Sequence, residues 1–230
     1  MKKNFEDFEK KINVTFINKG LLKQAFVHRS YINENPKYAE EHNERLEFLG
    51  DAVLELVVTD YLYRSYPGKN EGDLTLWRAA LVNSTSLSKI AKMLEMENFL
   101  LLSRGEAKDI GRGRQYILAN AFEAFIGAIY LDKGYEEARK FIEKNLLPEL
   151  NGIILNNLYR DSKSRFQEEA QERVSITPTY DVLKEWGPDH DKHFEVGVFL
   201  EKDLVGVGEG LSKQEAEQKA ADSALKKKGW

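Results

Sequence analysis

Residues 43–54 of the chain read NERLEFLGDAVL. If this stretch is an α-helix with about 100° between successive residues, its acidic residues fall within roughly 80° of one another, and its aliphatic residues cluster on the other side. We therefore expect an apolar face in a core and an acidic face turned outward, which indicates either a metal site or a solvated charged surface. The acids are Glu44, Glu47, Asp51 and Glu55, and the aliphatic residues are Leu46, Leu49, Val53, Leu56 and Val57.

Phe48 does not fit this division. It projects among the acids of the same helix, at about 40° from Glu44, rather than with the leucines. An aromatic side chain on a charged face is typical of a surface that meets a partner.

Composition limits the protein class. The chain has 230 residues, of which 42% are hydrophobic, so it is long enough to bury a core. It contains no cysteine, which excludes disulfides and thiolate zinc sites. No apolar run at the start suggests a signal peptide, no stretch is long enough to cross a membrane, and we expect a cytoplasmic protein. The net charge of −4 gives no bulk indication of nucleic-acid binding.

From Phe5 to about Leu150 the apolar residues follow a helical period. Breaks are expected at residues 35–36, 66–68 and 132–134, where proline or glycine occurs. Residues 146–160 are predicted to contain a helix end and a short polar connector.

The pattern changes after this connector. Short alternating runs rich in β-branched and aromatic residues predict three strands, and a helix is expected on each side of them. Ser212 is a candidate N-cap of the last helix, with Glu215 as its capping-box partner. The expected order is helix 164–173, strands 179–186, 193–200 and 204–210, and helix 212–228.

A second polar pair lies in the apolar run that follows residue 116. Asn120 and Glu123 stand at i and i+3 there, and an ionised carboxylate in such a helix is costly unless it is paired or binds a cation. Glu71 precedes another helix, in the run KNEGD. Oxygen ligands without histidine or cysteine favour Mg²⁺.

These segments together resemble the ribonuclease III endonucleases. Residues 43–54 are similar to the family signature, Glu71 to its Glu-Gly element, and Asn120 with Glu123 to its second acidic pair. The resemblance implies a multidomain protein, with an all-α endonuclease domain at residues 1–152. An α+β double-stranded-RNA-binding domain of order α-β-β-β-α follows at residues 160–229.

The resemblance also implies a reaction and its partners. We expect a homodimer that hydrolyses double-stranded RNA with Mg²⁺, or Mn²⁺ in its place, and without an organic cofactor or a membrane. The products would carry 5′-phosphate and 3′-hydroxyl ends, and the substrates would be ribosomal RNA precursors and structured messenger RNAs. The implied roles are metal binding for Glu47, Asp51, Asn120 and Glu123, catalysis for Asp51, Glu123, Glu44 and Glu71, and a dimer contact for Phe48.

The implied RNA contacts lie in the second domain. They are Gln167 and Glu168 in its first helix, His190 in its first loop, and Lys213 and Lys219 in its last helix. Such a domain reads the A-form minor groove by shape and 2′-hydroxyls, and phosphates attract its lysines. The domain is not basic overall, because residues 156–230 hold 15 acidic and 12 basic side chains.

Asn120 departs from the family, which usually has aspartate there. Asparagine keeps an oxygen ligand but loses the negative charge. Three interpretations stay open: a natural variant that still binds Mg²⁺, an engineered substitution that traps substrate, or an RNA-binding dimer that does not cut. A phosphohydrolase of small nucleotides would share the metal chemistry, but it does not explain the second domain.

Overall fold

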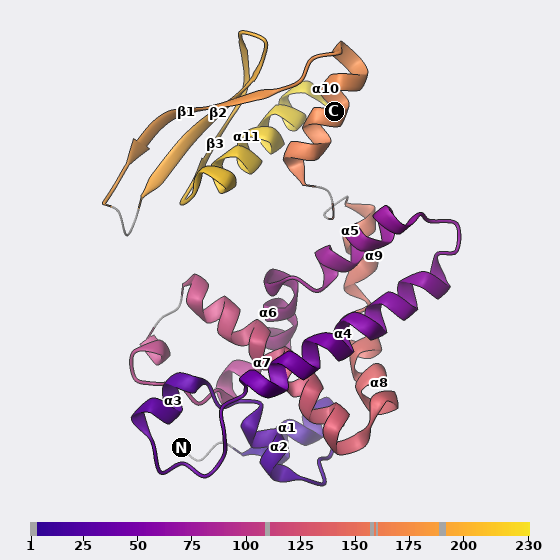
Figure 1. Ribbon diagram of the computed structural model, residues 1–230, viewed down its shortest axis with the longest axis vertical. Coiled ribbons are helices and arrows are strands. Elements are labelled where there is room, and N and C mark those ends of the chain that lie inside the picture. The colour runs from indigo at the N-terminus through magenta and orange to yellow at the C-terminus, as the bar shows by residue number, and fades with distance from the viewer. Residues whose placement is uncertain (1–3, 109–110, 157–158, 160, 189–191) are drawn as a thin grey trace. The chain divides into compact units, whose positions relative to one another are not determined.

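The computed structural model describes residues 4–108, 111–156, 159, 161–188 and 192–230. The chain divides into two compact units, residues 1–159 and 160–230, and each is described by itself. The first unit is helical, and the second combines two helices with a three-stranded sheet, as the sequence predicts (Figure 1). None of the helices in the described part of the chain combines the length and apolar composition that a bilayer crossing requires.

Three helices of the first unit end where proline or glycine was expected to end them, and the breaks after Ile12, Gln24, Leu81 and Met93 were not predicted. Its third helix stops at Glu34, its fourth at Ser65 and its seventh at Lys133. The elements are α1 (Phe5–Ile12), α2 (Lys19–Gln24), α3 (Arg29–Glu34), α4 (Glu44–Ser65), α5 (Glu71–Leu81), α6 (Ser84–Met93), α7 (Arg112–Lys133), α8 (Tyr135–Asn145) and α9 (Glu149–Leu155), with short 3₁₀ turns at Met96–Phe99 and Glu106–Lys108.

Helices α4 and α7 cross at the centre of this unit almost backbone to backbone. A Cβ added at Gly50 of α4 would lie 1.8 Å from the carbonyl oxygen of Glu123, and one added at Gly127 of α7 would lie 2.3 Å from that of Leu46. Any larger residue at either glycine would push the helices apart.

The buried face of α4 is rotated from the one that the sequence predicts. Leu46, Val53 and Val57 are buried as expected, but Leu56 is 57% exposed and that part of the prediction is wrong. The reason is the contact at Gly50, which turns Leu54 and Val58 into the core and leaves Leu56 on the solvent side.

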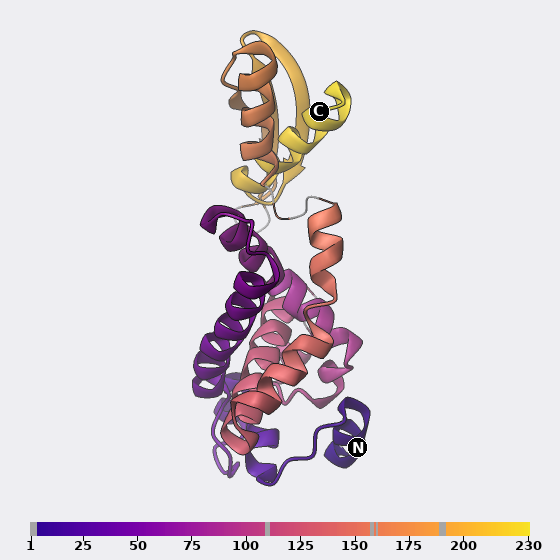
Figure 2. The ribbon, with the colours of Figure 1, turned by 90° about the vertical axis from the view of Figure 1, so that its right-hand side faces the viewer.

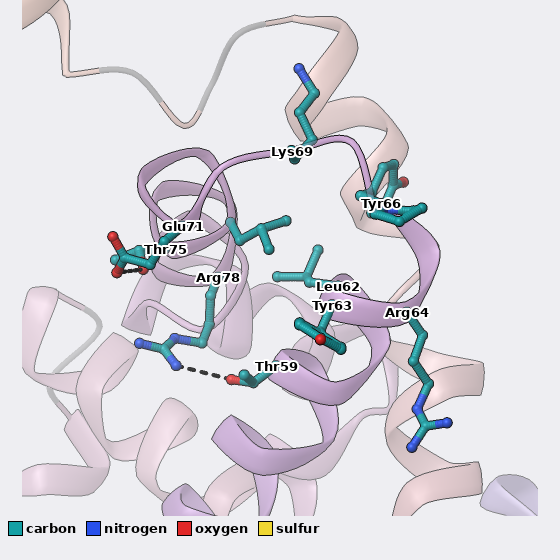
Figure 3. Close-up of a pocket in the computed structure, with 11 residues that line it drawn as sticks. Thr59, Leu62, Tyr63, Arg64, Tyr66, Lys69, Glu71, Thr75 and Arg78 are labelled. Carbon is teal, nitrogen blue, oxygen red and sulfur yellow. Dashed lines mark hydrogen bonds between the residues drawn. The ribbon is translucent and has the colours of Figure 1, made fainter.

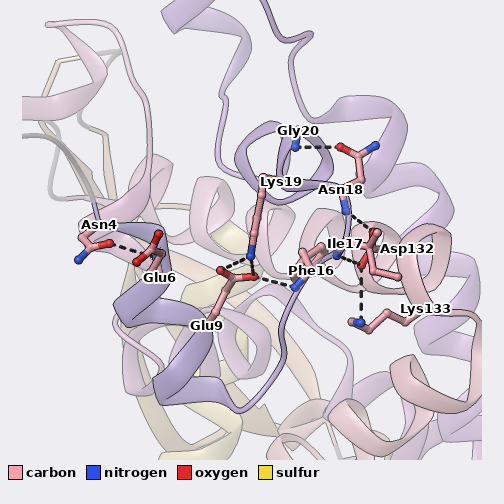
Figure 4. Close-up of polar contacts among 10 residues, drawn as sticks. All are labelled: Asn4, Glu6, Glu9, Phe16, Ile17, Asn18, Lys19, Gly20, Asp132 and Lys133. Atoms are coloured by element: carbon pink, nitrogen blue, oxygen red, sulfur yellow. Dashed lines mark hydrogen bonds and ion pairs between the residues drawn. The ribbon is translucent and has the colours of Figure 1, made fainter.

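Two buried acids fasten the segment between α1 and α2 (Figure 4). Glu9 accepts hydrogen bonds from the Phe16 backbone N–H at 2.7 Å and from Lys19 Nζ at 2.6 Å. Asp132, near the end of α7, accepts them from the backbone N–H groups of Ile17 at 2.8 Å and Asn18 at 2.7 Å. The segment between α1 and α2 is thereby held against the end of α7.

Residues 149–155, which fall within the helix end and polar connector predicted for residues 146–160, form helix α9. Leu150 and Ile153 are buried, and α9 packs against α5. Tertiary burial of two apolar side chains accounts for this helix, because so short a segment forms no stable helix alone.

The second unit has the predicted α-β-β-β-α order. Both helices pack against the antiparallel sheet β1-β2-β3 or against each other (Figures 1 and 2). Ser212 caps the last helix by accepting a hydrogen bond from the Glu215 N–H at 3.2 Å, while Glu215 accepts one from the Leu211 N–H at 3.1 Å. The elements are α10 (Ser162–Val174), β1 (Thr179–Trp186), β2 (His193–Leu200), β3 (Asp203–Gly210) and α11 (Lys213–Lys228).

Candidate functional site

The crossing of α4 and α7 brings together polar side chains far apart in the sequence. Glu47 and Asp51 lie one turn apart on α4 on either side of Gly50, and Asn120 and Glu123 lie on α7 across the same contact. The side chain of Asn120 is hydrogen-bonded to Glu47, and the charges of Asp51 and Glu47 act on Glu123. The four residues predicted to bind metal therefore face one another.

Burial and repulsion make ionisation unfavourable here. Burial raises the pKa of Glu123 to about 8, and the carboxylates of Asp51 and Glu47 add to that increase. Burial also raises the pKa of Glu47, as do Glu44 and Asp51, whereas the hydrogen bond from Asn120 opposes the increase. The site thus gathers carboxylates that repel one another when they are ionised.

This donor set fits a hard divalent cation. Within the described residues, no three His, Cys, Asp or Glu side chains gather closely enough to enclose a metal ion by themselves. Mg²⁺ needs no such cage, because it keeps several water ligands and is commonly held by one or two carboxylates. A cation between the helices would also relieve the repulsion that raises the pKa of Glu123.

The two outer acids lie differently. Glu44 starts α4, stands 3.5 Å from the Arg29 guanidinium and 3.8 Å from His42 Nδ1, and contributes to the raised pKa of Glu47. Glu71 starts α5 and accepts a hydrogen bond from Thr75 Oγ1 at 3.0 Å (Figure 3). The residues that surround Glu71 come from α4, α5 and the loop between them, and they include none of the four residues at the crossing of α4 and α7.

Glu71 instead lines a cavity of about 710 Å³ between α4 and α5. Arg78 crosses it to donate a hydrogen bond to Thr59 Oγ1 at 2.9 Å (Figure 3). The other lining residues are Leu62, Tyr63, Arg64, Tyr66, Pro67, Lys69, Leu74 and Thr75.

An exposed apolar stripe runs along α4 beside the acids. Phe48 is 82% exposed, as its place in the sequence pattern predicts, and it is followed by Leu56 and by Tyr63, which is 71% exposed. Sequence reasoning placed Leu56 on the buried face and did not single out Tyr63. The signal for them was their spacing from Phe48, since positions 48, 52, 56 and 63 share one side of a helix.

In the second unit the predicted RNA contacts are on the surface. Gln167 and Glu168 are exposed on α10, and they line a shallow depression with their helix neighbours. Lys213 and Lys219 are exposed at the start of α11, where Lys219 Nζ is 3.2 Å from Glu215. His190 lies outside the described residues.

A further lysine joins this surface. The Nζ atoms of Lys192 and Lys213 both lie 5.8 Å from the centre of the Phe194 ring, so two cations flank one aromatic side chain. Sequence reasoning missed Lys192. Its position follows from the pairing of Phe194 with Gly210, which brings the start of β2 next to the end of β3, near Lys213.

Comparison with known proteins agrees with this division of the chain. Residues 18–150 match the family model described as ribonuclease-III-like, and residues 162–228 match the double-stranded RNA binding motif. The chain is 45% identical to Ribonuclease 3 of a Nitratiruptor species, covering 97% of this chain and 96% of that protein. It is 48% identical to Ribonuclease 3 of Pelotomaculum thermopropionicum, covering 94% of this chain and 90% of that protein.

Solved structures resemble the first unit. A nuclease domain of ribonuclease III from Campylobacter jejuni is 44% identical, with a TM-score of 0.55, over 62% of this chain and 98% of that one. A second structure of that domain is 42% identical, with a TM-score of 0.57, over 65% of this chain and 96% of that one.

Proposed function

The chain belongs to the ribonuclease III family of endoribonucleases, and from this premise we propose that it hydrolyses double-stranded RNA with Mg²⁺, or Mn²⁺ in its place, to 5′-phosphate and 3′-hydroxyl ends. The observation that carries this proposal is the crossing of α4 and α7 at Gly50. It sets Glu47 and Asp51 against Asn120 and Glu123, where their carboxylates repel one another unless a cation lies between them.

Each side chain has a distinct task in this proposal. Asp51 and Glu123 supply the two carboxylates that face each other across the helix pair, and Glu123 must lose its proton before it can bind a cation. Asn120 donates a hydrogen bond that favours the ionised form of Glu47. Bound Mg²⁺ would lower the pKa of a water molecule and stabilise the leaving oxygen of the phosphodiester.

We place the RNA on the second unit. Gln167 and Glu168 can reach 2′-hydroxyls in the minor groove, while Lys213 and Lys219 meet phosphates near the start of α11. His190 is assigned to the neighbouring groove by sequence alone. Precursors of ribosomal RNA and structured messenger RNAs are the proposed substrates.

The working unit is proposed to be a homodimer. The Campylobacter jejuni nuclease domain is described as structurally flexible in a region involved in dimer formation. In this chain, the exposed Phe48 ring would enter the cavity between α4 and α5 of a second copy, whose apolar wall includes Leu62 and Leu74. Because Glu47 and Asp51 flank Phe48, insertion would carry them toward the Glu71 that lines the same cavity.

End-labelled duplex RNA tests the proposal. The chain should cut it in Mg²⁺ and leave it intact in EDTA, and Asp51→Asn should remove cutting while retaining the gel shift. Ligation and phosphatase sensitivity of the fragments would identify their ends. A gel shift without cutting in either Mg²⁺ or Mn²⁺ would instead assign the chain to RNA binding alone.

A further inference from the structure

Three aromatic rings join the connector between the two units to helix α5. Trp77 is only 3% exposed, and the rings of Tyr66 and Tyr159 pack edge-on against it, with centroids 4.9 Å and 5.9 Å away. Tyr66 follows the last residue of α4, and Tyr159 belongs to the connector beyond α9. Tyr159 therefore returns the chain to a helix more than 70 positions earlier in the sequence.

Packing against the neighbouring tyrosine rings holds the Trp77 indole in place. The Trp77 Nε1 atom is buried without a hydrogen-bond partner in the described part of the chain, so no polar contact holds it. Lys69 Nζ lies 5.3 Å from the indole centroid on the side of the cavity. Edge-to-face aromatic pairs have a preferred geometry, and this one restricts where Tyr159 can sit.

We propose that Tyr159 is a positioning residue that anchors the tether of the RNA-binding unit to α5. Helix α10 is capped by Asp161, two positions after Tyr159. Tyr159 and Asp161 are two positions apart, so the anchor and the cap of α10 can be separated by at most about 7 Å. Asn156, the C-cap of α9, is five positions before Asp161, so without the contact at Tyr159 the nearest fixed point could lie up to about 17 Å from that cap.

When the RNA-binding unit has bound RNA, the length of the tether sets the effective concentration of that RNA at the nuclease unit. Lengthening a tether lowers that effective concentration by at least the −3/2 power of its length. The anchor also lies on α5, the helix that begins with Glu71 and lines the cavity proposed for a second copy. Its expected kinetic effect rests on the proposed nuclease function, whereas its effect on domain motion does not.

The test uses the full chain and two independent readouts. Because the chain has no cysteine, Lys202→Cys introduces a single thiol to which a fluorescent dye can be attached. Position 202 lies in the turn between β2 and β3 of the RNA-binding unit. In this background, Tyr159→Ala should add a faster component to the fluorescence anisotropy decay. It should also raise KM for duplex RNA roughly three- to tenfold with kcat unchanged. Tyr159→Phe, which retains the ring, should restore both.

A matched control separates anchoring from general destabilisation. Tyr135→Ala removes another half-buried tyrosine from the first unit without touching the connector, so it should change neither KM nor the decay. Tyr159→Leu keeps apolar bulk without a ring and covers the case in which Tyr159→Ala does not fold. Unchanged decay and KM in both ring-deleted variants, or an equal effect of Tyr135→Ala, would overturn the proposal. If the parent does not cut RNA, the nuclease proposal fails while the anisotropy result still judges the anchor.

Discussion

Gly50 of α4 lies against the backbone carbonyl of Glu123 in α7, so closely that an added Cβ would come within 1.8 Å of that oxygen. The carboxylates of Glu47 and Asp51 sit on either side of this contact. Their distance from Glu123 is therefore set by a glycine that carries no functional group. Packing and the proposed chemistry depend on the same backbone contact.

Gly50→Ala should damage stability and cutting together. The new methyl group meets backbone rather than a movable side chain, so we expect a loss of about 3 kcal/mol or more in the free energy of unfolding. Urea denaturation in EDTA measures it. The control is Gly152→Ala in α9, where nothing lies within 4 Å of the added atom. That change should stabilise the chain by about 0.5–1 kcal/mol. Equal effects of the two changes would contradict the close crossing.

The metal-free protein should lose stability as pH rises from about 4.5 to about 8. In that window the folded protein keeps a proton on Glu123 that the unfolded chain has released. Unfolding therefore becomes easier by at most about 1.4 kcal/mol per pH unit for this one proton. Glu123→Gln should flatten the slope measured by urea denaturation in EDTA more than the same substitution at the exposed Glu97 does. An unchanged slope in Glu123→Gln would show that Glu123 titrates as in the unfolded chain.

Asn120→Asp should strengthen metal binding and weaken the metal-free protein. The change replaces a hydrogen-bond donor to Glu47 with a further negative charge. The pKa values of Glu47 and Glu123, which are already raised, should therefore rise further. The Mg²⁺ concentration for half-maximal cutting should fall roughly three- to tenfold, because ligand charge tunes affinity. Titration of the cutting rate with Mg²⁺ measures this. No gain over the parent would mean that a neutral oxygen at position 120 suffices.

Phe48→Ala should weaken self-association. Anchoring aromatic residues commonly contribute about 2 kcal/mol or more at an interface, which corresponds to a dissociation constant roughly 30-fold higher. Sedimentation equilibrium measures the change. Leu155→Ala is the control, because Leu155 in α9 is 81% exposed and Phe48 is 82% exposed. Equal association of the parent and Phe48→Ala would remove the aromatic contact from the proposed interface.

Lys213→Ala should reduce the salt dependence of RNA binding. Loss of one phosphate contact lowers the slope of log K against log salt by about 1. Gel shifts at several salt concentrations measure the slope. Lys226→Ala removes a lysine from the other end of α11 that is paired with Asp222, and it should leave the slope unchanged. A similar decrease for Lys226 would indicate a diffuse charge effect.

Local patterns in the chain were enough for much of the architecture. Three helices end at Glu34, Ser65 and Lys133, each just before a proline or glycine. The three strands coincide with short runs of alternating apolar and polar residues. The chemical types at the candidate site were also readable, because residues at i, i+3 and i+4 share one side of a helix. These features depend on backbone geometry within one segment.

The remaining features depend on contacts between distant segments. Leu56 is exposed because Gly50 meets α7, and α9 is helical because Leu150 and Ile153 are buried. The pKa of Glu123 rises because the side chain is buried and two carboxylates from α4 act on it. Tyr159 lies near α5 because its ring packs against Trp77. Periodicity shows which face of a helix is apolar but not which partner covers it, since burial energy belongs to the assembled core.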